Sequence, residues 1–327
     1  MTTSRALVLR EPGPATFEEL SDADLPDGDV TVAVAYSSLN YKDGLAVSGE
    51  GKIARRLPMV CGIDLAGTVE ASDSPHFAVG DEVVLTGWGL SETHPGGYTQ
   101  HQRVRSEWLV PRPYPLSLRQ AMAVGTAGLT AMLCVMALEQ AGVGVADERE
   151  VLVTGAGGGV GNVAVALLAA LGHRVAASTG RAELHDYLRS LGATTIVDRA
   201  ELSTPGRPLA PERWAGAIDT VGSQTLATVL SQVRYGGAVA ACGLAGGNDL
   251  PTTVLPFILR GISLLGVDSA QCPTSHRIAA WRRIGLELAP AVLDSMTTVE
   301  PLSRVPELAH EILAGHIRGR VVIDTSI

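Results

Sequence analysis

The segment from Val151 to Gly161, VLVTGAGGGVG, constrains the fold more than any other part of the chain. An apolar run leads into a cluster of glycines, and an Ala/Val/Leu-rich run follows. A strand, a glycine loop and a helix in this order bind a pyrophosphate, because backbone without Cβ atoms can approach it closely. The loop is one residue longer than G-x-G-x-x-G, so the strand and helix around it carry the prediction. A glycine turn that binds no ligand is the alternative.

Strands and helices are predicted to alternate from Glu150 onward. The predicted strands are 151–154, 174–178, 195–197, 217–220 and 238–242, and the predicted helices are 160–171, 182–191 and 224–233. This alternation indicates βαβ units and a doubly wound parallel sheet. Aromatic residues make up only 4% of the chain, and aliphatic cores suit parallel strands buried on both faces. We therefore expect an α/β fold with a Rossmann domain over residues 121–269.

The first third of the chain has a different pattern, with short β segments separated by Gly, Pro and Asp. Strands are predicted at 5–10, 30–36, 63–71, 79–86 and 97–110, and no helix is expected before about Leu118. A helix interrupted at Gly125 is predicted over 118–141, a second near 276–288, and a closing strand at 320–323. These patterns predict a β-rich domain over residues 1–120, completed by residues 270–327.

Composition excludes several classes of protein. Charged residues make up 18% and the net charge is -9, which argues against a protein that coats nucleic acid. The four cysteines, Cys61, Cys134, Cys242 and Cys272, form no C-x-x-C pair, so neither a disulfide scaffold nor a zinc knuckle is expected. The chain does not open like a signal peptide, and the apolar stretch 163–171 is too short to span a bilayer. We expect a cytoplasmic protein with no nucleic-acid or membrane partner.

The residues after the second predicted strand bear on the choice of cofactor. An NAD-binding unit places Asp or Glu about 20 residues after the glycine loop, on the ribose 2′-hydroxyl. Here the sequence STGR (178–181) has no carboxylate. Arg181 can bind a 2′-phosphate, and Ser178 and Thr179 can donate hydrogen bonds to it. Arg199 could reach the adenine or the same phosphate, although both arginines could simply be solvated. The pattern favours NADPH.

Long blocks of the chain resemble a known family. They include SSLNYKDGLAVSGEGKI (37–53), GIDLAGTVEASDSP (62–75), GTAGLTAMLCVMALE (125–139) and LPTTVLPFILRGISLLGVDS (250–269). The chain resembles the zinc-free branch of the medium-chain dehydrogenase/reductase superfamily, and most closely its NADPH-dependent acrylyl-CoA reductases. The resemblance weakens only around 271–299, and the glycine loop departs from the usual GASGGVGS at Gly157 and Asn162. It implies a GroES-like catalytic domain and a Rossmann domain.

The resemblance also bears on metal binding. Zinc-dependent relatives carry Gly-His-Glu where this chain has Gly62-Ile63-Asp64, so the imidazole ligand is missing. Cys61 alone cannot hold zinc. No metal is therefore expected.

The resemblance implies reduction of the C=C bond of an enoyl thioester. A hydride passes from the nicotinamide to the β-carbon, and the α-carbon is then protonated. Asn40 and Tyr41 are the expected catalytic residues, because either can polarise the thioester carbonyl or deliver a proton. The alternative for Tyr41 is a loop tyrosine with a packed ring. Lys42 and Asp43 could simply pair with each other.

Residues of several segments are expected to bind the cofactor. Some come from the glycine loop and the strand after it, and others, such as Gly243, Leu244 and Asp268, from strand ends where open α/β sheets bind ligands. Thr130 is a candidate wall near the nicotinamide, or a helix residue needed for packing, and Arg320 matches a basic position of the family. The expected cofactor-binding residues are Gly44, Thr130, Gly158, Gly159, Val160, Gly161, Asn162, Ser178, Thr179, Gly180, Arg181, Arg199, Gly243, Leu244, Asp268 and Arg320.

The expected substrate-binding residues are Lys52, Arg55, Arg56 and Trp88. The three cations could receive the phosphates of CoA, although a solvated basic loop has the same composition. A quinone or alkenal reductase, or a protein that binds NADPH without turnover, are the rival functions. A homodimer is also expected, because the predicted strand 262–267 would otherwise leave a sheet edge open, and relatives pair in this way.

Overall fold

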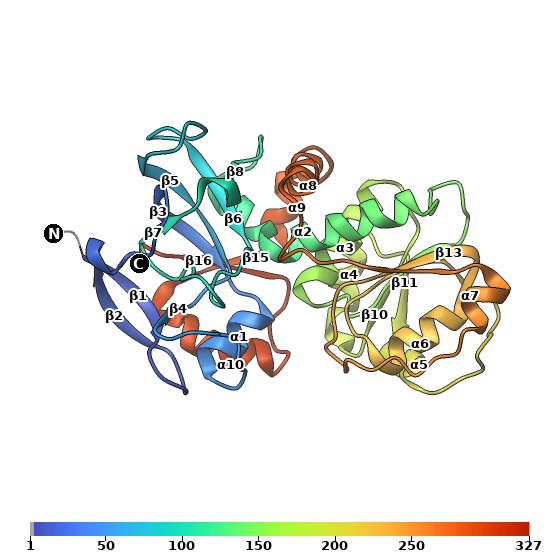
Figure 1. Ribbon diagram of the computed structural model, residues 1–327. Helices are drawn as coiled ribbons and strands as arrows, with labels where there is room; N and C mark the ends of the chain where they lie inside the picture. Colours follow the sequence, from blue (N-terminus) through green and yellow to red (C-terminus); the bar gives the residue numbers. More distant parts are fainter. Residues whose placement is uncertain (1–2, 327) are drawn as a thin grey trace. The chain divides into compact units, whose positions relative to one another are not determined.

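The computed structural model describes residues 3–326 (Figure 1). The chain forms two compact units. One contains the residues up to Thr126 together with those from Ser269 onward, and the other contains Ala127–Asp268. The chain passes between them within helix α2 (Leu118–Gln140) and again after strand β14 (Ser263–Gly266).

The unit of residues 127–268 is built on a six-stranded sheet in which every neighbouring pair of strands is parallel. Its order is β11-β10-β9-β12-β13-β14. The bounds are β9 Glu150–Val153, β10 Val175–Thr179, β11 Thr195–Asp198, β12 Trp214–Asp219 and β13 Val233–Ala241. The helices are α3 Gly159–Ala170, α4 His185–Ser190, α5 Arg199–Ser203, α6 Ser223–Gln232 and α7 Leu255–Arg260. The predicted doubly wound parallel sheet is confirmed.

The strand order places the glycine loop at a special point of this sheet. From β9 the chain builds outward through β10 to β11, and then returns to the other side of β9 with β12, β13 and β14. The order therefore reverses between β9 and β12, and open α/β sheets bind ligands beyond the carboxyl ends of strands at such a switch point. Buried Leu152, Trp214 and Val239 are among the aliphatic and aromatic side chains that hold the sheet and its helices together.

The other unit contains two sheets. Strands β2 (Thr16–Ser21), β1 (Thr3–Leu9) and β4 (Met59–Val60) form the smaller one. The larger sheet has the order β15-β16-β3-β5-β6-β8, and β7 also pairs with β3. Its strands are β3 Val30–Ser38, β5 Asp64–Ser72, β6 Glu82–Thr86, β7 His101–Val104, β8 Val110–Pro111, β15 Thr297–Pro301 and β16 Arg320–Asp324. The helices are α1 Tyr41–Ser48, α8 Thr274–Glu287, α9 Pro290–Ser295 and α10 Val305–Leu313.

Several expectations for this unit were wrong in detail. Helix α1 was not predicted, because it is short and carries Gly44 at its centre. Its stability comes from packing against α10: a Cβ at Gly44 would lie 2.8 Å from Cγ2 of Ile312. The predicted strand 97–110 is divided into β7 and β8 by a 3₁₀ turn, and α9, β15 and α10 were missed. Strand β6 begins at Glu82 rather than 79, since Ala78–Asp81 closes a turn.

Helix α2 carries the predicted interruption. Gly125 has φ 52° and ψ −158°, which divides the helix into two parts. By length and composition α2 is the one helix of residues 3–326 that could cross a membrane, and 78% of its most apolar window is buried in the protein. The sequence prediction had considered only the shorter run 163–171 in this respect.

Candidate functional site

The glycine loop between β9 and α3 has a backbone that only glycine permits. Gly155 has φ +58°, and a Cβ at Gly161 would lie 2.3 Å from the carbonyl oxygen of Gly155. The backbone at these points is therefore packed on itself, and the first turn of α3 begins directly behind the loop at Gly159. N–H groups of a first helical turn have no partner within the helix, so Gly159, Val160 and Gly161 can offer theirs to a pyrophosphate.

Asn162 supports the loop from inside. Its side chain is fully buried, and Nδ2 donates to the carbonyl oxygen of Gly158 at 2.7 Å. Its Oδ1 is buried and accepts no hydrogen bond from the described residues. The residue that departs from the family pattern therefore holds Gly158, which was itself expected to bind the cofactor.

A buried carboxylate that the sequence analysis missed joins the loop to the neighbouring strand. Asp219 ends β12, and its Oδ1 accepts from Oγ1 of Thr154 at 2.7 Å while its Oδ2 accepts from the N–H of Gly222 at 2.7 Å. The N–H of Thr220 donates to Oγ1 of Thr154 at 3.1 Å. Burial raises the pKa of Asp219. This network ties the carboxyl ends of β9 and β12 together at the switch point.

Two arginines lie beside the glycine loop and the end of β10. Nη2 of Arg181 donates to the carbonyl oxygen of Gly157 at 2.8 Å, and a Cβ at Gly157 would lie 2.7 Å from that nitrogen. A side chain at position 157 would therefore displace the end of Arg181 from this contact. A Cβ at Gly180 would similarly lie 3.0 Å from Nε of Arg199. Burial lowers the pKa of Arg181, but a guanidinium still carries its positive charge at neutral pH.

The other expected cofactor residues of this unit differ in exposure. Ser178 and Thr179 are buried, and Oγ1 of Thr179 accepts from the N–H of Arg181 at 3.1 Å. Thr130 is buried within α2. Gly243 packs so closely on Thr220 that a Cβ would lie 2.4 Å from its carbonyl oxygen. The remaining two, Leu244 and Asp268, are exposed beyond the carboxyl ends of β13 and β14.

The unit that contains α1 holds a buried polar cluster around Asp64. Its Oδ2 accepts from Nδ2 of Asn40 and from the N–H of Thr126, both at 2.9 Å, and from the hydroxyl of Ser38. Its Oδ1 accepts from Oγ1 of Thr126 at 2.5 Å. Arg320 is also buried here, where Nε donates to the carbonyl oxygen of Ala123 at 2.8 Å and Nη1 to that of Leu39 at 3.3 Å. These bonds give Arg320 a structural role, and its expected contact with the cofactor stays a prediction.

Asp43 is the second carboxylate of this cluster. Its Oδ2 accepts from the backbone N–H of Asn40 at 2.9 Å, and its Oδ1 accepts from that of Ile63 at 2.9 Å. Burial, together with the nearby charge of Asp64, raises the pKa of Asp43 to about 7. The expectation that Lys42 and Asp43 might pair with each other was wrong, because Asp43 is fully buried and Nζ of Lys42 contacts Oε2 of Glu92 at 2.7 Å.

The raised pKa of Asp43 predicts how stability depends on pH. The folded protein binds a proton at Asp43 up to about pH 7, whereas the unfolded chain releases it near the ordinary value of 3.8. The free energy of unfolding should therefore fall as the pH rises between these values, by at most ~1.4 kcal/mol per pH unit from this group. Urea unfolding of the wild type and of Asp43→Asn from pH 4 to pH 8 measures the contribution. Equal slopes for the two proteins would show that Asp43 titrates normally.

Asn40 and Tyr41 have different surroundings. Asn40 is buried, and its Nδ2 lies within hydrogen-bond distance of Ser38, Asp43 and Asp64. Tyr41 is the first residue of α1 rather than a loop residue, and 53% of it is exposed. The phenol is thus free to meet a ligand, whereas the Asn40 amide is already engaged within the protein.

Glu92 joins α1 to the expected CoA-phosphate residues. It accepts from Lys42 and, through Oε1, from Nε of Arg55 at 3.0 Å, and these two cations hold the pKa of Glu92 below its ordinary value. The other two expected residues, Lys52 and Arg56, are exposed. Lys52, Arg55 and Arg56 therefore form a basic group that follows α1 in the chain, and Glu92 pairs with one of its members, Arg55.

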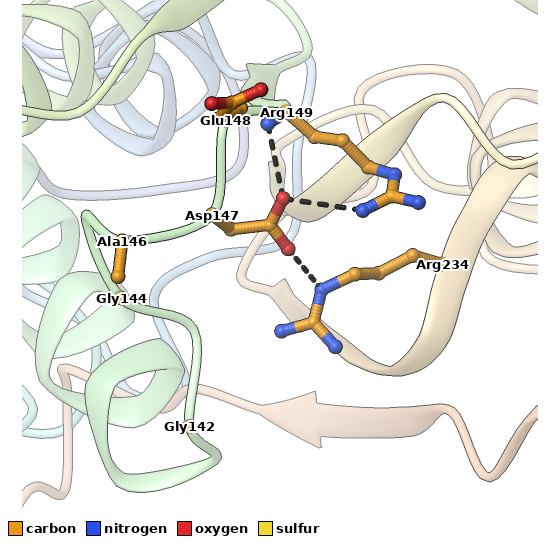
Figure 2. A pocket seen from close by; sticks show the side chains of 7 residues that line it. All are labelled: Gly142, Gly144, Ala146, Asp147, Glu148, Arg149 and Arg234. Carbon is orange, nitrogen blue, oxygen red and sulfur yellow. Dashed lines mark hydrogen bonds and ion pairs between the residues drawn. The ribbon is translucent and has the colours of Figure 1, made fainter.

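A cavity of about 530 Å³ lies elsewhere, at the amino end of the parallel sheet. Figure 2 shows Asp147 between Arg149 and Arg234, with hydrogen bonds or ion pairs to both. The residues that line the cavity come before β9 and at the start of β13. The cavity is therefore at the amino ends of these strands, whereas the glycine loop follows the carboxyl end of β9. Asp147, Arg149 and Arg234 are paired with one another here, and none of the glycine-loop residues lines this cavity.

Residues 3–326 contain no group of three or more His, Cys, Asp or Glu side chains placed to hold a metal ion. Cys61 is fully buried, and burial together with the charge of Asp43 raises the pKa of its thiol to about 12. A thiol binds zinc after losing its proton, so Cys61 is a poor ligand in these surroundings.

Comparisons with known proteins agree with this arrangement. Residues 26–114 match the alcohol dehydrogenase GroES-like domain, and residues 159–284 match the zinc-binding dehydrogenase family. The chain is 55% identical to acrylyl-CoA reductase AcuI of Ruegeria pomeroyi, over 95% of this chain and 94% of the relative. It is 46% identical to the putative quinone oxidoreductase YhfP of Bacillus subtilis, over 93% and 92%.

Among solved structures, the YhdH oxidoreductase of Salmonella enterica in complex with NADP superposes with a TM-score of 0.95. The two chains are 52% identical, and the match covers 98% of this chain and 99% of the other.

Proposed function

The chain belongs to the medium-chain dehydrogenase/reductase superfamily, and on this basis we propose that it reduces the C=C bond of acrylyl-CoA to give propanoyl-CoA, with NADPH as the reductant. The observation that carries the proposal is the 55% identity to an acrylyl-CoA reductase over 95% of the chain. The glycine loop, together with Arg181 and Arg199 beside the end of β10, fits a phosphorylated dinucleotide.

Bound NADPH supplies the hydride that the β-carbon of the enoyl thioester receives. Negative charge then develops on the thioester oxygen, and the α-carbon needs a proton. Tyr41 is the residue suited to this, since its phenol is an exposed hydrogen-bond donor at the first turn of α1. Asn40 has a supporting role, because its buried amide donates to Asp43 and Asp64 and so holds the start of α1, where Tyr41 lies, in place.

The proposal is tested by following NADPH oxidation with acrylyl-CoA, crotonyl-CoA and a quinone side by side. Acrylyl-CoA should be reduced with the highest kcat/KM of the three. Tight binding of NADPH without turnover of acrylyl-CoA would refute the proposal, and it would leave a nucleotide-binding protein without this activity.

A quinone reductase is the second candidate, since the chain is 46% identical to a protein described as a putative quinone oxidoreductase. The two candidates differ in their need for a phosphate site, because a quinone carries no phosphate. Lys52, Arg55 and Arg56 are exposed cations that could receive the phosphates of CoA.

Replacing Lys52, Arg55 and Arg56 together by Ala should raise KM for acrylyl-CoA about tenfold, because exposed ion pairs contribute about 0.2–1 kcal/mol each. The KM for a quinone should not change. The matched control removes three other exposed cations, Arg189, Arg207 and Arg282. An equal rise in KM from both triple variants would mean that only the net charge matters, and the phosphate assignment would be wrong.

We also propose a homodimer formed through the β14 edge of the parallel sheet. Strand β14 is the last strand of that sheet. Helix α7, which precedes β14 in the chain and packs on β13, exposes Ile258 (68%) and Leu259 (57%), and Val254 just before α7 is 65% exposed. An open edge next to apolar side chains is a surface that a second copy of the chain would cover. Light scattering at micromolar concentration should give twice the chain mass of 34.0 kDa. A mass of one chain there would contradict the dimer.

The proposed enzyme is zinc-free and cytoplasmic, and it takes no nucleic acid or membrane as a partner. The proposal that the enzyme is zinc-free is supported by Ile63, which stands where zinc-dependent relatives have a histidine. We also propose that residues 1–120, completed by residues 270–327, form the catalytic domain, and that residues 121–269 form the NADP-binding domain.

A further inference from the structure

Trp88 has a backbone conformation that a bulky side chain rarely adopts. Its φ is +51°, and its neighbours Gly87 and Gly89 have φ of +72° and +80°. A left-handed conformation is strained for a residue with a Cβ, so the surroundings must impose it. Such residues gather at functional sites, where the fold holds them in place.

Backbone contacts hold Trp88 on one side. Its N–H donates to the carbonyl oxygen of Ala270 at 2.9 Å. At Gly87 a Cβ would lie 2.8 Å from the same oxygen, so the turn lies directly against this segment. The loop that follows is attached to α1 and to the basic group, because Glu92 pairs with Lys42 at 2.7 Å and with Arg55 at 3.0 Å.

Arg277 of α8 holds the same turn from the other side. The side chain is fully buried. Nη1 donates to the carbonyl oxygen and to Oγ1 of Thr86, both at 2.8 Å, and Nη2 donates to the carbonyl oxygens of Ser269 at 2.9 Å and Ala270 at 3.3 Å. Its guanidinium carbon lies 5.2 Å from the centre of the Trp88 ring, within the range of a cation–π contact.

One guanidinium therefore binds the residue two positions before Trp88, the segment that accepts the Trp88 N–H, and the indole ring itself. A lysine could not make these contacts together, because it lacks the planar set of donors. Burying a charge in this way is costly unless it is well bonded, which points to a selected arrangement rather than a surface accident.

We propose that Arg277 is a positioning residue that fixes Trp88, and that the fixed indole limits the length of the acyl chain on the enoyl thioester. This rests on the proposed function and on Trp88 as a substrate-binding residue. A rigid ring admits the three-carbon acrylyl group and opposes longer chains, which would have to displace it. Arg277 acts through Trp88 and makes no contact with the reacting atoms.

The test is the ratio of kcat/KM for trans-2-hexenoyl-CoA to that for acrylyl-CoA, with NADPH held saturating. Trp88→Gly keeps the left-handed backbone without strain. It should raise this ratio about tenfold or more, since one additional methylene accommodated in a pocket changes kcat/KM about 10- to 200-fold. Arg277→Lys should raise the ratio in the same direction, and Thr86→Val, which removes one acceptor of Arg277, should raise it less.

Trp281→Phe is the matched control, because Trp281 is a second buried tryptophan on α8, four residues beyond Arg277. It should lower the melting temperature without moving the ratio. If Arg277→Lys does not fold, Thr86→Val decides the role of Arg277. An unchanged ratio in Trp88→Gly would overturn the acyl-length limit. A change in Trp88→Gly with none in Arg277→Lys or in folded Thr86→Val would overturn the positioning role. Failure of the wild type to reduce acrylyl-CoA would instead refute the proposed function.

Discussion

Replacing Tyr41 by Phe should lower kcat for acrylyl-CoA by about 100- to 1000-fold and leave the Kd for NADPH nearly unchanged. The ring is kept, so the start of α1 should pack as before, and only the hydroxyl donor is lost. One donor directed at charge that develops in the transition state is commonly worth about 2.7–4 kcal/mol. Because 53% of Tyr41 is exposed, the substitution breaks no buried hydrogen bond, and the melting temperature should change little.

The measurement combines steady-state kinetics with a kinetic isotope effect from NADPH deuterated at the transferred position. Tyr114→Phe is the control, because Tyr114 is 84% exposed and lies far along the chain from α1. It should leave kcat unchanged. If Tyr41→Phe retains the wild-type kcat while the isotope effect shows that hydride transfer limits the rate, Tyr41 has no part in the chemistry.

Replacing Arg181 by Ala should weaken NADPH binding about ten- to a hundredfold and affect NADH much less. A charge-assisted hydrogen bond to a phosphate contributes about 1.5–3 kcal/mol, and NADH has no 2′-phosphate to receive it. Arg181 also donates to the carbonyl oxygen of Gly157, so a small loss of NADH affinity is expected from the loosened glycine loop. The wild-type preference for NADPH should decrease at high ionic strength.

Further variants separate the contribution of Arg199 to NADPH binding from that of Arg181. Arg199→Ala and the double variant show how the two cations share the phosphate, and Arg189→Ala, an exposed arginine of α4, controls for net charge. Isothermal titration with NADPH and NADH gives each Kd. Equal affinity of the wild type for both cofactors, or full selectivity in the double variant, would show that the 2′-phosphate is bound elsewhere.

The sequence predicted well those features that depend on local pattern. The alternation of apolar runs along 151–242 indicated the parallel sheet, and glycine at 155 and 161 marked the loop where a Cβ has no room. The absence of a carboxylate at 178–181 directed attention to Arg181, which the structure places against the loop. Each of these depends on residues close together in the chain, so periodicity and spacing were sufficient.

Tertiary structure alone decided the rest. Helix α1 is too short to be predicted by its own propensity, and packing on α10 stabilises it around Gly44. Asp43 and Asp64 read as ordinary acidic residues, yet folding buries both beside Asn40 and raises the pKa of Asp43. Arg277 reaches Thr86 across a separation of 191 residues, and no local pattern shows which distant carbonyl groups a buried charge will meet. Local sequence pattern was thus enough to predict the sheet and the glycine loop. Which polar side chains lost water and needed partners inside the protein depended on the three-dimensional fold.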